Sequence, residues 1–327
     1  MVLNVYKDFQ LQGVIKSFNL LTWRRRYNRP GDFQLNLEFS REMFDLIKSG
    51  DVICLQNDQE GAWIENITKI TKSNGERVLE IAGRFLSSIM NRRIVNYTAT
   101  AAAKTHIDAI LAQNFLSPTD TARKIPQLVV RPYTLAKNPS SAVEFTQKIA
   151  EDCINETIKP AGAGYKVLYN IANKTYDLVF YEGRERDALF SDRNKNIITQ
   201  DYYALTADMK NVCYVKSNDY AETVGTAQGL GRREMALTAI TKTAASLYGQ
   251  GAAALQKQKE VYSFDTEINS ESPQFLYRRD WDLGDIVASE DNDLGILLRS
   301  NVVEVTESYD NGGVTIAPVF GDTIPQL

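Results

Sequence analysis

Residues 47–58 read IKSGDVICLQND, and residues 281–292 read WDLGDIVASEDN. Each stretch places a Gly-Asp pair, Gly50-Asp51 and Gly284-Asp285, directly before an apolar run that contains β-branched residues. This pattern predicts a tight turn that leads into a strand. We expect both glycines to adopt positive φ, and both aspartates to brace their turns through bonds to the backbone. Valine at either glycine is expected to harm folding or assembly.

The similarity continues beyond the two turns. Each copy goes on with an alternating strand, a hairpin turn containing Asn-Gly and a closing strand that ends at glycine: 67–71, 74–75 and 78–83 in the first copy, and 302–306, 311–313 and 314–321 in the second. Coincidence is the alternative, because such turns are common in any β-rich chain. The shared order favours an internal duplication.

The composition is that of an ordinary globular protein with room for more than one domain. The chain has 327 residues, of which 43% are hydrophobic and 24% are charged, and this length allows two or three domains. The net charge of −4 argues against binding of nucleic acid over the whole surface, since such binding needs a basic excess. A basic patch confined to one part of the surface is still compatible with this net charge.

Cysteine usage and the first residues indicate the compartment in which the chain folds. Cys54, Cys153 and Cys213 are far apart and form no C-x-x-C motif, so we expect small buried apolar side chains. Residues 1–13 lack the basic region and apolar run of a signal peptide, and no stretch is apolar enough for a membrane span. We expect folding in a cytoplasm and no membrane insertion.

Three segments differ in pattern, and we expect one domain in each: residues 1–95, 96–200 and 201–327. The first is β-rich, with strands expected at 2–6, 11–21, 33–39, 52–55, 63–70 and 78–81. The last is expected to hold a strand at 212–216, a helix over 232–259 that breaks at Gly249–Gly251, and the second β copy.

The middle segment is expected to mix helices and strands. An alanine-rich run predicts a helix over 99–116, and Ser141-x-x-Glu144 predicts a capping box for a second helix that ends at Pro160. Residues 127–130 are expected to form a strand, and 165–183 a hairpin. The predicted fold class is α+β, mainly β.

No residue pattern points to catalysis, a cofactor or a metal. His106 is the one histidine, and since no nucleophile motif accompanies it, we expect a solvated helical side chain. The glycines of 225–231 lack the spacing of phosphate-binding loops, and the acidic run 290–293 lacks a calcium-binding EF-hand loop. We therefore predict no catalytic, cofactor-binding or metal-binding residue, and a protein that is not an enzyme.

The strongest basic cluster lies at residues 23–29, which contain Trp23, Arg24, Arg25, Arg26, Tyr27 and Arg29. Arginine interleaved with aromatic residues is typical of nucleic-acid surfaces and also of protein interfaces. A strand sends Arg24 and Arg26 to one face and Arg25 to the other, which divides the cluster. We favour an interface, and expect any DNA affinity to be feeble and lost at modest salt.

Several motifs together resemble the baseplate hub or tail hub proteins of phage tails, prophages and phage-tail-like particles. The first is PGDFQLNLEFS (30–40) followed by IKSGDVICL (47–55). The second is GLGRREMALTA (229–239), which looks like the segment at the entry to a helix in these hubs, and whose Arg232 and Arg233 we add to the interface candidates. The third is YRRDWDLGDIV (277–287) with the closing strands of 302–321.

The resemblance implies two similar tail-tube-type β-barrel domains that flank a mixed α+β domain. It implies a homotrimer that forms a pseudo-sixfold ring between the hexameric tail tube and a threefold spike or fibre. The implied partners are the tail tube protein, distal tail or baseplate proteins and the spike or fibre, with DNA only as passing cargo. The implied location is the virion tail or baseplate, or a phage-tail-like particle, assembled in the bacterial host cytoplasm.

Two other functions remain open. One is a tail-associated cell-wall hydrolase, against which the missing catalytic motifs argue. The other is a nucleic-acid-binding barrel module, with residues 23–29 as its footprint.

Overall fold

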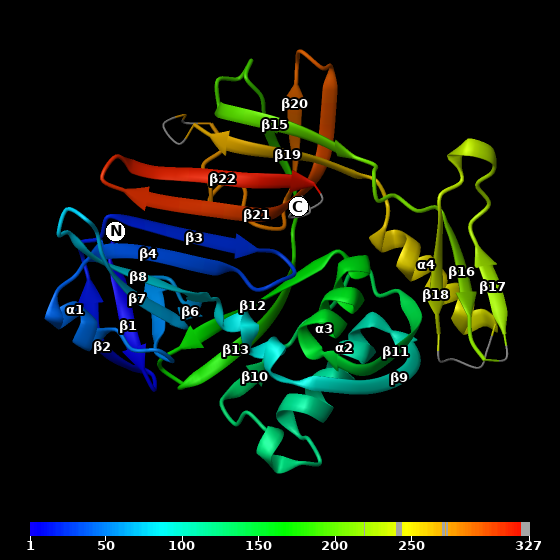
Figure 1. Cartoon of the computed structure of the whole chain (residues 1–327), viewed down its shortest axis with the longest axis horizontal. Helices are drawn as coiled ribbons and strands as arrows, with labels where there is room; N and C mark the ends of the chain where they lie inside the picture. Colours follow the sequence, from blue (N-terminus) through cyan, green and yellow to red (C-terminus); the bar gives the residue numbers. More distant parts are fainter. Residues whose placement is uncertain (219, 240–243, 270–271, 273, 322–327) are drawn as a thin grey trace.

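The computed structural model describes residues 1–218, 220–239, 244–269, 272 and 274–321. Figure 1 shows a large sheet, a part with helices beside it, and a small β unit at one end. Strands make up most of the regular structure in the described residues, so the predicted mainly β, α+β fold class is confirmed. None of the helices found there has the length and apolar character needed to cross a membrane.

The largest sheet combines strands from both ends of the chain. In pairing order its main strands are β15 (Ile197–Leu205), β19 (Val261–Ile268), β22 (Gly313–Gly321), β21 (Ile296–Asp310), β3 (Leu20–Arg26), β4 (Asp32–Glu38), β8 (Arg77–Arg84) and β7 (Asn66–Thr71). Strand β20 (Ile286–Asp291) pairs with β21 and with β14 (Glu185–Phe190). The first and last segments thus share one hydrogen-bonded surface (Figure 1).

One face of this sheet is buried because its strands alternate. In β4, Phe33 and Leu35 are fully buried whereas Gln34 between them is exposed. The buried side chains of β3, β4 and β8 share a core with a second layer. That layer consists of β2 (Gln10–Ile15), β1 (Leu3–Lys7), β5 (Val52–Leu55) and β6 (Gly61–Trp63). The other half of the sheet has its own core, around Trp281 and Phe320.

Two expected strands of the first segment are each divided. Residues 11–21 form the end of β2 and the start of β3, separated at 16–19, and residues 63–70 form parts of β6 and β7. Helix α1 (Arg41–Leu46) begins after Ser40, whose side chain accepts the backbone N–H of Met43.

The middle segment contradicts part of both helix predictions. Residues 99–102 belong to strand β9 (Ile94–Ala102), and helix α2 (Ala103–Leu111) starts only after it. Ser141 and Glu144 form no capping box, because they lie in strand β11 (Ser140–Ile149), and helix α3 (Ala150–Ile158) follows. The two errors have one cause: β11 pairs with β9, and this pairing between distant segments overrides helix propensity.

The remaining elements of the middle segment surround a third core. The predicted hairpin is present as β12 (Ala163–Asn170) and β13 (Thr175–Glu182), and β10 (Leu128–Val130) pairs with β13 in parallel. Helices α2 and α3 pack into this core together with Tyr6 and Trp63 from the first segment. Short helical turns lie at Leu86–Arg92, Ala112–Leu116, Thr121–Arg123, Lys159–Ala161 and Gly229–Gly231.

A small unit is inserted between β15 and β19. Its sheet has the order β17 (Ala221–Val224), β16 (Val212–Lys216) and β18 (Glu234–Thr238), and helix α4 (Ala244–Lys257) packs on it. The helix expected from Arg232 is wrong over 234–238, which form β18 parallel to β16; its residues 240–243 lie outside the described residues. Helix α4 continues through 249–251, so the expected break is wrong. The glycine at 251 serves close packing: a Cβ there would lie 2.6 Å from side-chain carbons of Val215 and Val224.

Candidate assembly interface

The large sheet contains the same strand order twice. The first half is β3-β4-β8-β7 and the second half is β15-β19-β22-β21. In both halves the first two strands pair antiparallel, and the last two form the hairpin that the sequence repeat predicts. The two Gly-Asp turns stand at corresponding places, before β5 and before β20. The two sequence copies therefore have the same place in the topology.

The two halves join head to tail. The first strand of the first half, β3, pairs antiparallel with the last strand of the second half, β21, from Leu20↔Asp310 to Arg26↔Glu304. The strands left at the ends of the sheet are β15 and β7, each of which pairs on one side only within the described residues. These two strands are the counterparts of the two that join. An unpaired edge of this kind offers backbone groups to another chain.

The face of the sheet opposite the cores is polar and mainly acidic. Its side chains alternate with the buried ones, and those that carry charge are Arg24, Arg26, Asp32, Glu38, Glu80, Arg84, Asp201, Asp265, Glu267, Glu304 and Asp310. Arg24 and Arg26 are held by ion pairs with Asp32 and Glu304, and Arg84 is paired with Glu65. Asp201 lies directly opposite Asp265, and burial together with this neighbouring carboxylate raises the pKa of Asp265.

A buried ion network ties the two halves together at the joint. Arg25 is 3% exposed. Its Nε donates to Glu60 Oε2 at 2.9 Å, and its Nη1 donates to Asp282 Oδ1 at 2.8 Å. Burial acts to lower the pKa of this guanidinium, but Glu60 and the other anionic neighbours raise it well above the ordinary value. Arg25 therefore stays charged inside the protein and links β3 to the segment before β20.

Arg278 makes a second link across the joint. Its Nη1 donates to Asp58 Oδ2 at 2.7 Å, and its Nη2 donates to Glu307 Oε1 at 2.8 Å. Asp58 lies in the loop between β5 and β6, whereas Glu307 lies in β21 and is 2% exposed. Burial acts to raise the pKa of Asp58, but the hydrogen bond from Arg278 and the other favourable contacts outweigh it, and the pKa is lowered.

The Asp58 link predicts a defined response to acid. A carboxyl whose folded pKa is depressed stabilises the fold above its unfolded pKa of about 3.9, and this contribution is lost as the pH falls through the folded pKa. Asp58→Asn removes the titrating group. We expect the free energy of unfolding of this variant, measured with urea, to fall less than that of the wild type between about pH 5 and pH 2. Parallel pH profiles for the two proteins would contradict this assignment.

The structure separates the residues that the sequence analysis grouped as an interface. Trp23 is fully buried in the core, and Arg25 and Tyr27 are also buried within the chain. Contrary to the expectation, a partner cannot contact these three residues. Alternation along β3 is the reason, since the face of Trp23 and Arg25 packs inward. Arg24 and Arg26 lie on the open face, and Arg29 is exposed.

Arg232 and Arg233 belong to the small inserted unit and not to this cluster. Arg232 pairs with Glu234 and donates to the Tyr214 hydroxyl at 2.7 Å. Sequence reasoning missed another basic group, formed by Arg92, Arg93 and Arg123 around a hollow of about 410 Å³. Burial and the two neighbouring guanidiniums lower the pKa of Arg93. Arg92 and Arg93 are adjacent in the sequence, but Arg123 lies 30 residues further on, so no single local motif contains all three.

The two Gly-Asp turns share a backbone shape but not a packing environment. Gly50 has a φ of 92° and Gly284 a φ of 93°. A Cβ on Gly50 would meet nothing within 4 Å, whereas one on Gly284 would lie 2.2 Å from Tyr27 Cε2. Tyr27 also donates to the carbonyl of Gly162 at 2.9 Å and accepts the N–H of Gly183 at 3.0 Å. Gly284 thus belongs to a contact of all three segments.

The two aspartates of these turns also differ in surroundings. Asp285 accepts the N–H of Asp282 at 3.0 Å, the N–H of Arg184 at 2.8 Å and Arg186 Nε at 2.7 Å. Asp51 is buried, and its desolvation raises its pKa although Lys7 and the backbone of Lys48 act against the rise. Asp285 is therefore bonded to the backbone of its own turn.

The single histidine lies inside the middle core and not in solvent. His106 is fully buried, with Nδ1 3.0 Å from the Tyr97 hydroxyl and Nε2 3.0 Å from the carbonyl of Ser141. The expectation of a solvated side chain is wrong, because α2 lies under the β9–β11 ribbon. The three cysteines are buried, as expected. Within the described residues, no group of three or more His, Cys, Asp or Glu side chains has the arrangement of a metal site.

Comparisons with known proteins agree with this topology. Residues 2–322 match the family model described as Siphovirus ReqiPepy6 Gp37-like protein. No curated protein matches the chain. Among solved structures, the fold is similar to the tail protein from Neisseria meningitidis MC58, with a TM-score of 0.66, 11% identity, and coverage of 98% of this chain and 96% of that one.

Two prophage tail proteins have similar folds. The 43 kDa tail protein of prophage MuSo2 from Shewanella oneidensis has a TM-score of 0.62 and 11% identity, with 98% and 96% of the chains covered. Tail protein gp18 from a Listeria monocytogenes EGD-e prophage has a TM-score of 0.57 and 10% identity, with 99% and 95% covered. The resemblance to the tail hub group is confirmed, and the chain belongs to the Siphovirus ReqiPepy6 Gp37-like protein family.

Proposed function

We propose that this chain is a structural hub protein of a phage tail or phage-tail-like particle, and that three copies form a closed ring. The observation that carries the proposal is the strand order, which occurs twice, head to tail, and leaves unpaired the counterparts of the two strands that join. The same joint between β7 of one copy and β15 of the next would extend the sheet from chain to chain. Closing the ring leaves neither end of the large sheet unpaired.

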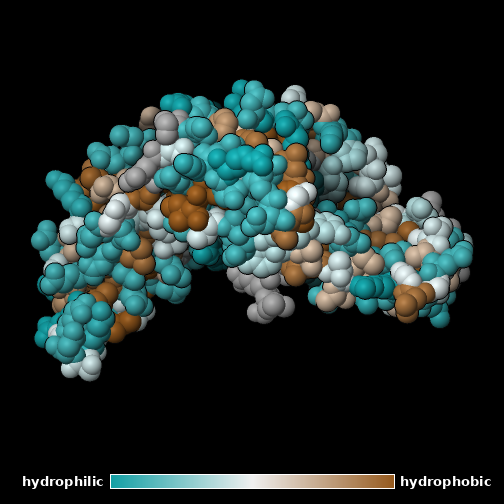
Figure 2. All heavy atoms as spheres, turned by 90° about the horizontal axis from the view of Figure 1, so that it is seen from above, coloured by the Kyte–Doolittle hydropathy of each residue, from teal (hydrophilic) through white to brown (hydrophobic). Residues whose placement is uncertain are grey.

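Three chains with two similar units each present six units, and this number explains how the ring could join partners of different symmetry. A pseudo-sixfold face matches a hexameric tail tube, while the true threefold symmetry matches a spike or fibre. Figure 2 shows the molecule from above as an arch that is hollowed on one side, a shape suited to a segment of a ring. We propose that each half of the large sheet, with its core, is one tail-tube-type β-barrel unit.

The acidic open face of the sheet suits the wall of a central channel. Passing DNA is repelled by carboxylates, so a genome would slide through without sticking. We propose the tail tube protein, distal tail or baseplate proteins and the spike or fibre as partners, DNA as cargo only, and the virion tail or baseplate as the location, after assembly in the host cytoplasm. We keep the units 1–95, 96–200 and 201–327 as a proposal, with the qualification that β14 and the first residues of β15 precede residue 201 but pair with strands of the last unit.

The mass of the purified protein in solution tests this proposal directly. We expect a trimer by light scattering, and threefold rings with six similar lobes after averaging of particle images. The ring buries two sheet edges per chain, so the trimer should persist at moderate salt, because backbone hydrogen bonds are not screened as ion pairs are. A protein that stays monomeric at every concentration tested would contradict the ring.

The rival functions have tests of their own. We propose a mechanical and not an enzymatic role, supported by the burial of His106 among structural hydrogen bonds; clear lysis of purified cell walls would overturn it. A nucleic-acid-binding module is disfavoured because the arginines of β3 are already paired with carboxylates of the same chain. Tight DNA binding at physiological salt would reverse that judgement.

A further inference from the structure

The joint inside the chain carries opposite charges on its two strands. Strand β3 contributes Arg24, Arg25 and Arg26 and no carboxylate, whereas β21 contributes Glu304, Glu307 and Asp310 over the paired stretch and no cation. Two of these charges meet across the joint, with Arg26 Nε 2.8 Å from Glu304 Oε2. In this joint, the first strand of one half is positive and the last strand of the other half is negative.

The two free edges carry the reverse arrangement. Strand β15, the counterpart of β3, contains Asp201 and neither lysine nor arginine. Strand β7, the counterpart of β21, contains Lys69 and no carboxylate. Glu307 and Lys69 correspond in direction as well: each lies on the face of its strand that is turned to the core, opposite Trp23 and Leu79 respectively. Over its paired stretch the last strand of the second half is negative, whereas the last strand of the first half is positive.

The edge of β15 also borders an acidic groove. A hollow of about 430 Å³ runs along 197–200 and is lined further by Asp192, Asp291 and Asp293, with Lys195 as its one cation. The three carboxylates take part in no ion pair within the described residues. Ile198 is 59% exposed at this edge. Unpaired carboxylates beside an exposed apolar side chain on a free sheet edge are typical of a surface that binds a partner.

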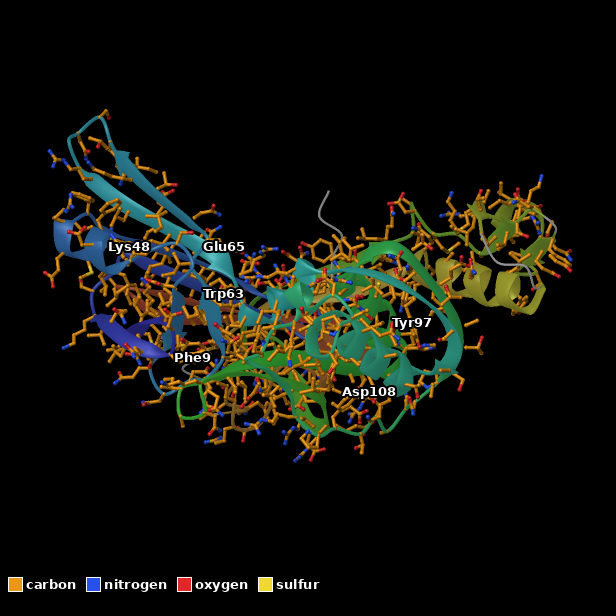
Figure 3. The ribbon with its side chains drawn as sticks, turned by 90° about the horizontal axis from the view of Figure 1, so that it is seen from below. Phe9, Lys48, Trp63, Glu65, Tyr97 and Asp108 are labelled. Carbon is orange, nitrogen blue, oxygen red and sulfur yellow. The ribbon has the colours of Figure 1, made fainter. Side chains whose placement is uncertain are left out.

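Lys69 of β7 also has no carboxylate partner within the described residues. Lys69 contacts the Phe39 ring, with Nζ 4.6 Å from its centroid, and makes no ion pair within the described parts of the chain. Figure 3 shows the β7–β8 hairpin projecting at the end of the molecule opposite α4, with Glu65 labelled at its base. In Figure 1 the β20–β21 hairpin projects past β15. Both features extend outward, as contact with another copy requires.

We propose that these charges decide which edges pair, and that the groove beside β15 receives Lys69 of a second copy. This inference rests on the ring proposed above, and it adds the reason why β7 of one chain pairs with β15 of the next and with no other edge. Opposite charges bring β7 to β15 of the next chain. Like charges disfavour pairing of β7 with β7, or of β15 with β15, between two copies, so two identical edges do not join. The repeated halves then alternate around the ring.

Charge reversal at the groove tests the proposal. Lys69→Glu places a carboxylate beside Asp291 and Asp293, and we expect the protein concentration for half-assembly, measured by sedimentation equilibrium, to rise about tenfold or more. The double substitution Asp291→Lys and Asp293→Lys should weaken assembly to a similar extent, because the groove beside β15 then repels Lys69. All three substitutions in one chain restore opposite charges, and assembly should return to near the wild-type concentration.

A matched control and the alternative outcomes keep the test decisive. Lys124→Glu changes the same charge at an exposed position of the middle segment, and assembly should be unaffected. Rescue by the triple variant excludes misfolding as the cause, since a misfolded chain is not repaired by two further substitutions. A wild-type trimer that Lys69→Glu leaves unchanged overturns this inference and leaves the ring intact. A wild-type protein that never trimerises overturns both.

Discussion

Gly284→Val is expected to cost about 4 kcal/mol or more of the free energy of unfolding, and to leave little soluble protein. The first added carbon would lie 2.2 Å from Tyr27 Cε2 and 2.9 Å from Tyr27 Cζ. The ring cannot retreat, because its hydroxyl is bonded to Gly162 and Gly183, and Gly164 packs against it from the middle segment. Valine at a φ of 93° adds backbone strain.

Gly50→Val is the matched control for this effect. It has the same turn shape, with a φ of 92°, but open space around the added carbon. Only the backbone strain remains, and we expect a loss of about 1–3 kcal/mol. Urea unfolding followed by far-UV circular dichroism measures both variants. Equal losses at the two glycines would show that the three-segment contact does not decide the effect.

Arg25→Met is expected to destabilise the protein by about 3–5 kcal/mol. The substitution keeps a long apolar side chain in place but leaves Glu60, which is 7% exposed, without its cation, and removes a donor from Asp282. An unpaired buried carboxylate is the main cost. Because these carboxylates belong to different halves, we also expect the two halves to unfold with less cooperativity.

Two further variants separate this buried pair from ordinary surface charge. Arg24→Met, one residue earlier on the open face, should cost less than about 1 kcal/mol, since partly exposed ion pairs contribute little. Arg25→Met combined with Glu60→Met should lose less than the sum of the two single losses, because removal of both charges leaves neither unpaired. Equal effects of Arg24→Met and Arg25→Met would rule out a special role for the buried network.

Predictions from the sequence succeeded where a short segment carries its own pattern. Phe33, Leu35 and Leu37 alternate with polar residues, and β4 is found there; the hairpin over 165–183 has apolar strands on both sides of a turn, and it is present. The helix predictions failed at 99–102, 141–149 and 234–238, where alanine, serine and glutamate suggested helices. In each of these places a strand from elsewhere in the chain supplies the pairing partner, and no local window contains that partner.

The sequence by itself determined the duplication, the positive-φ glycines at 50 and 284, and the alternation that turns Arg24 and Arg25 to opposite faces, because each depends on neighbouring residues and backbone sterics alone. Only the tertiary structure decided that the two copies share one sheet through β3 and β21, that Arg25 is buried between Glu60 and Asp282, and which edges stay free. These features depend on which distant segments pack together, and burial, pairing and charge partners are properties of that packing.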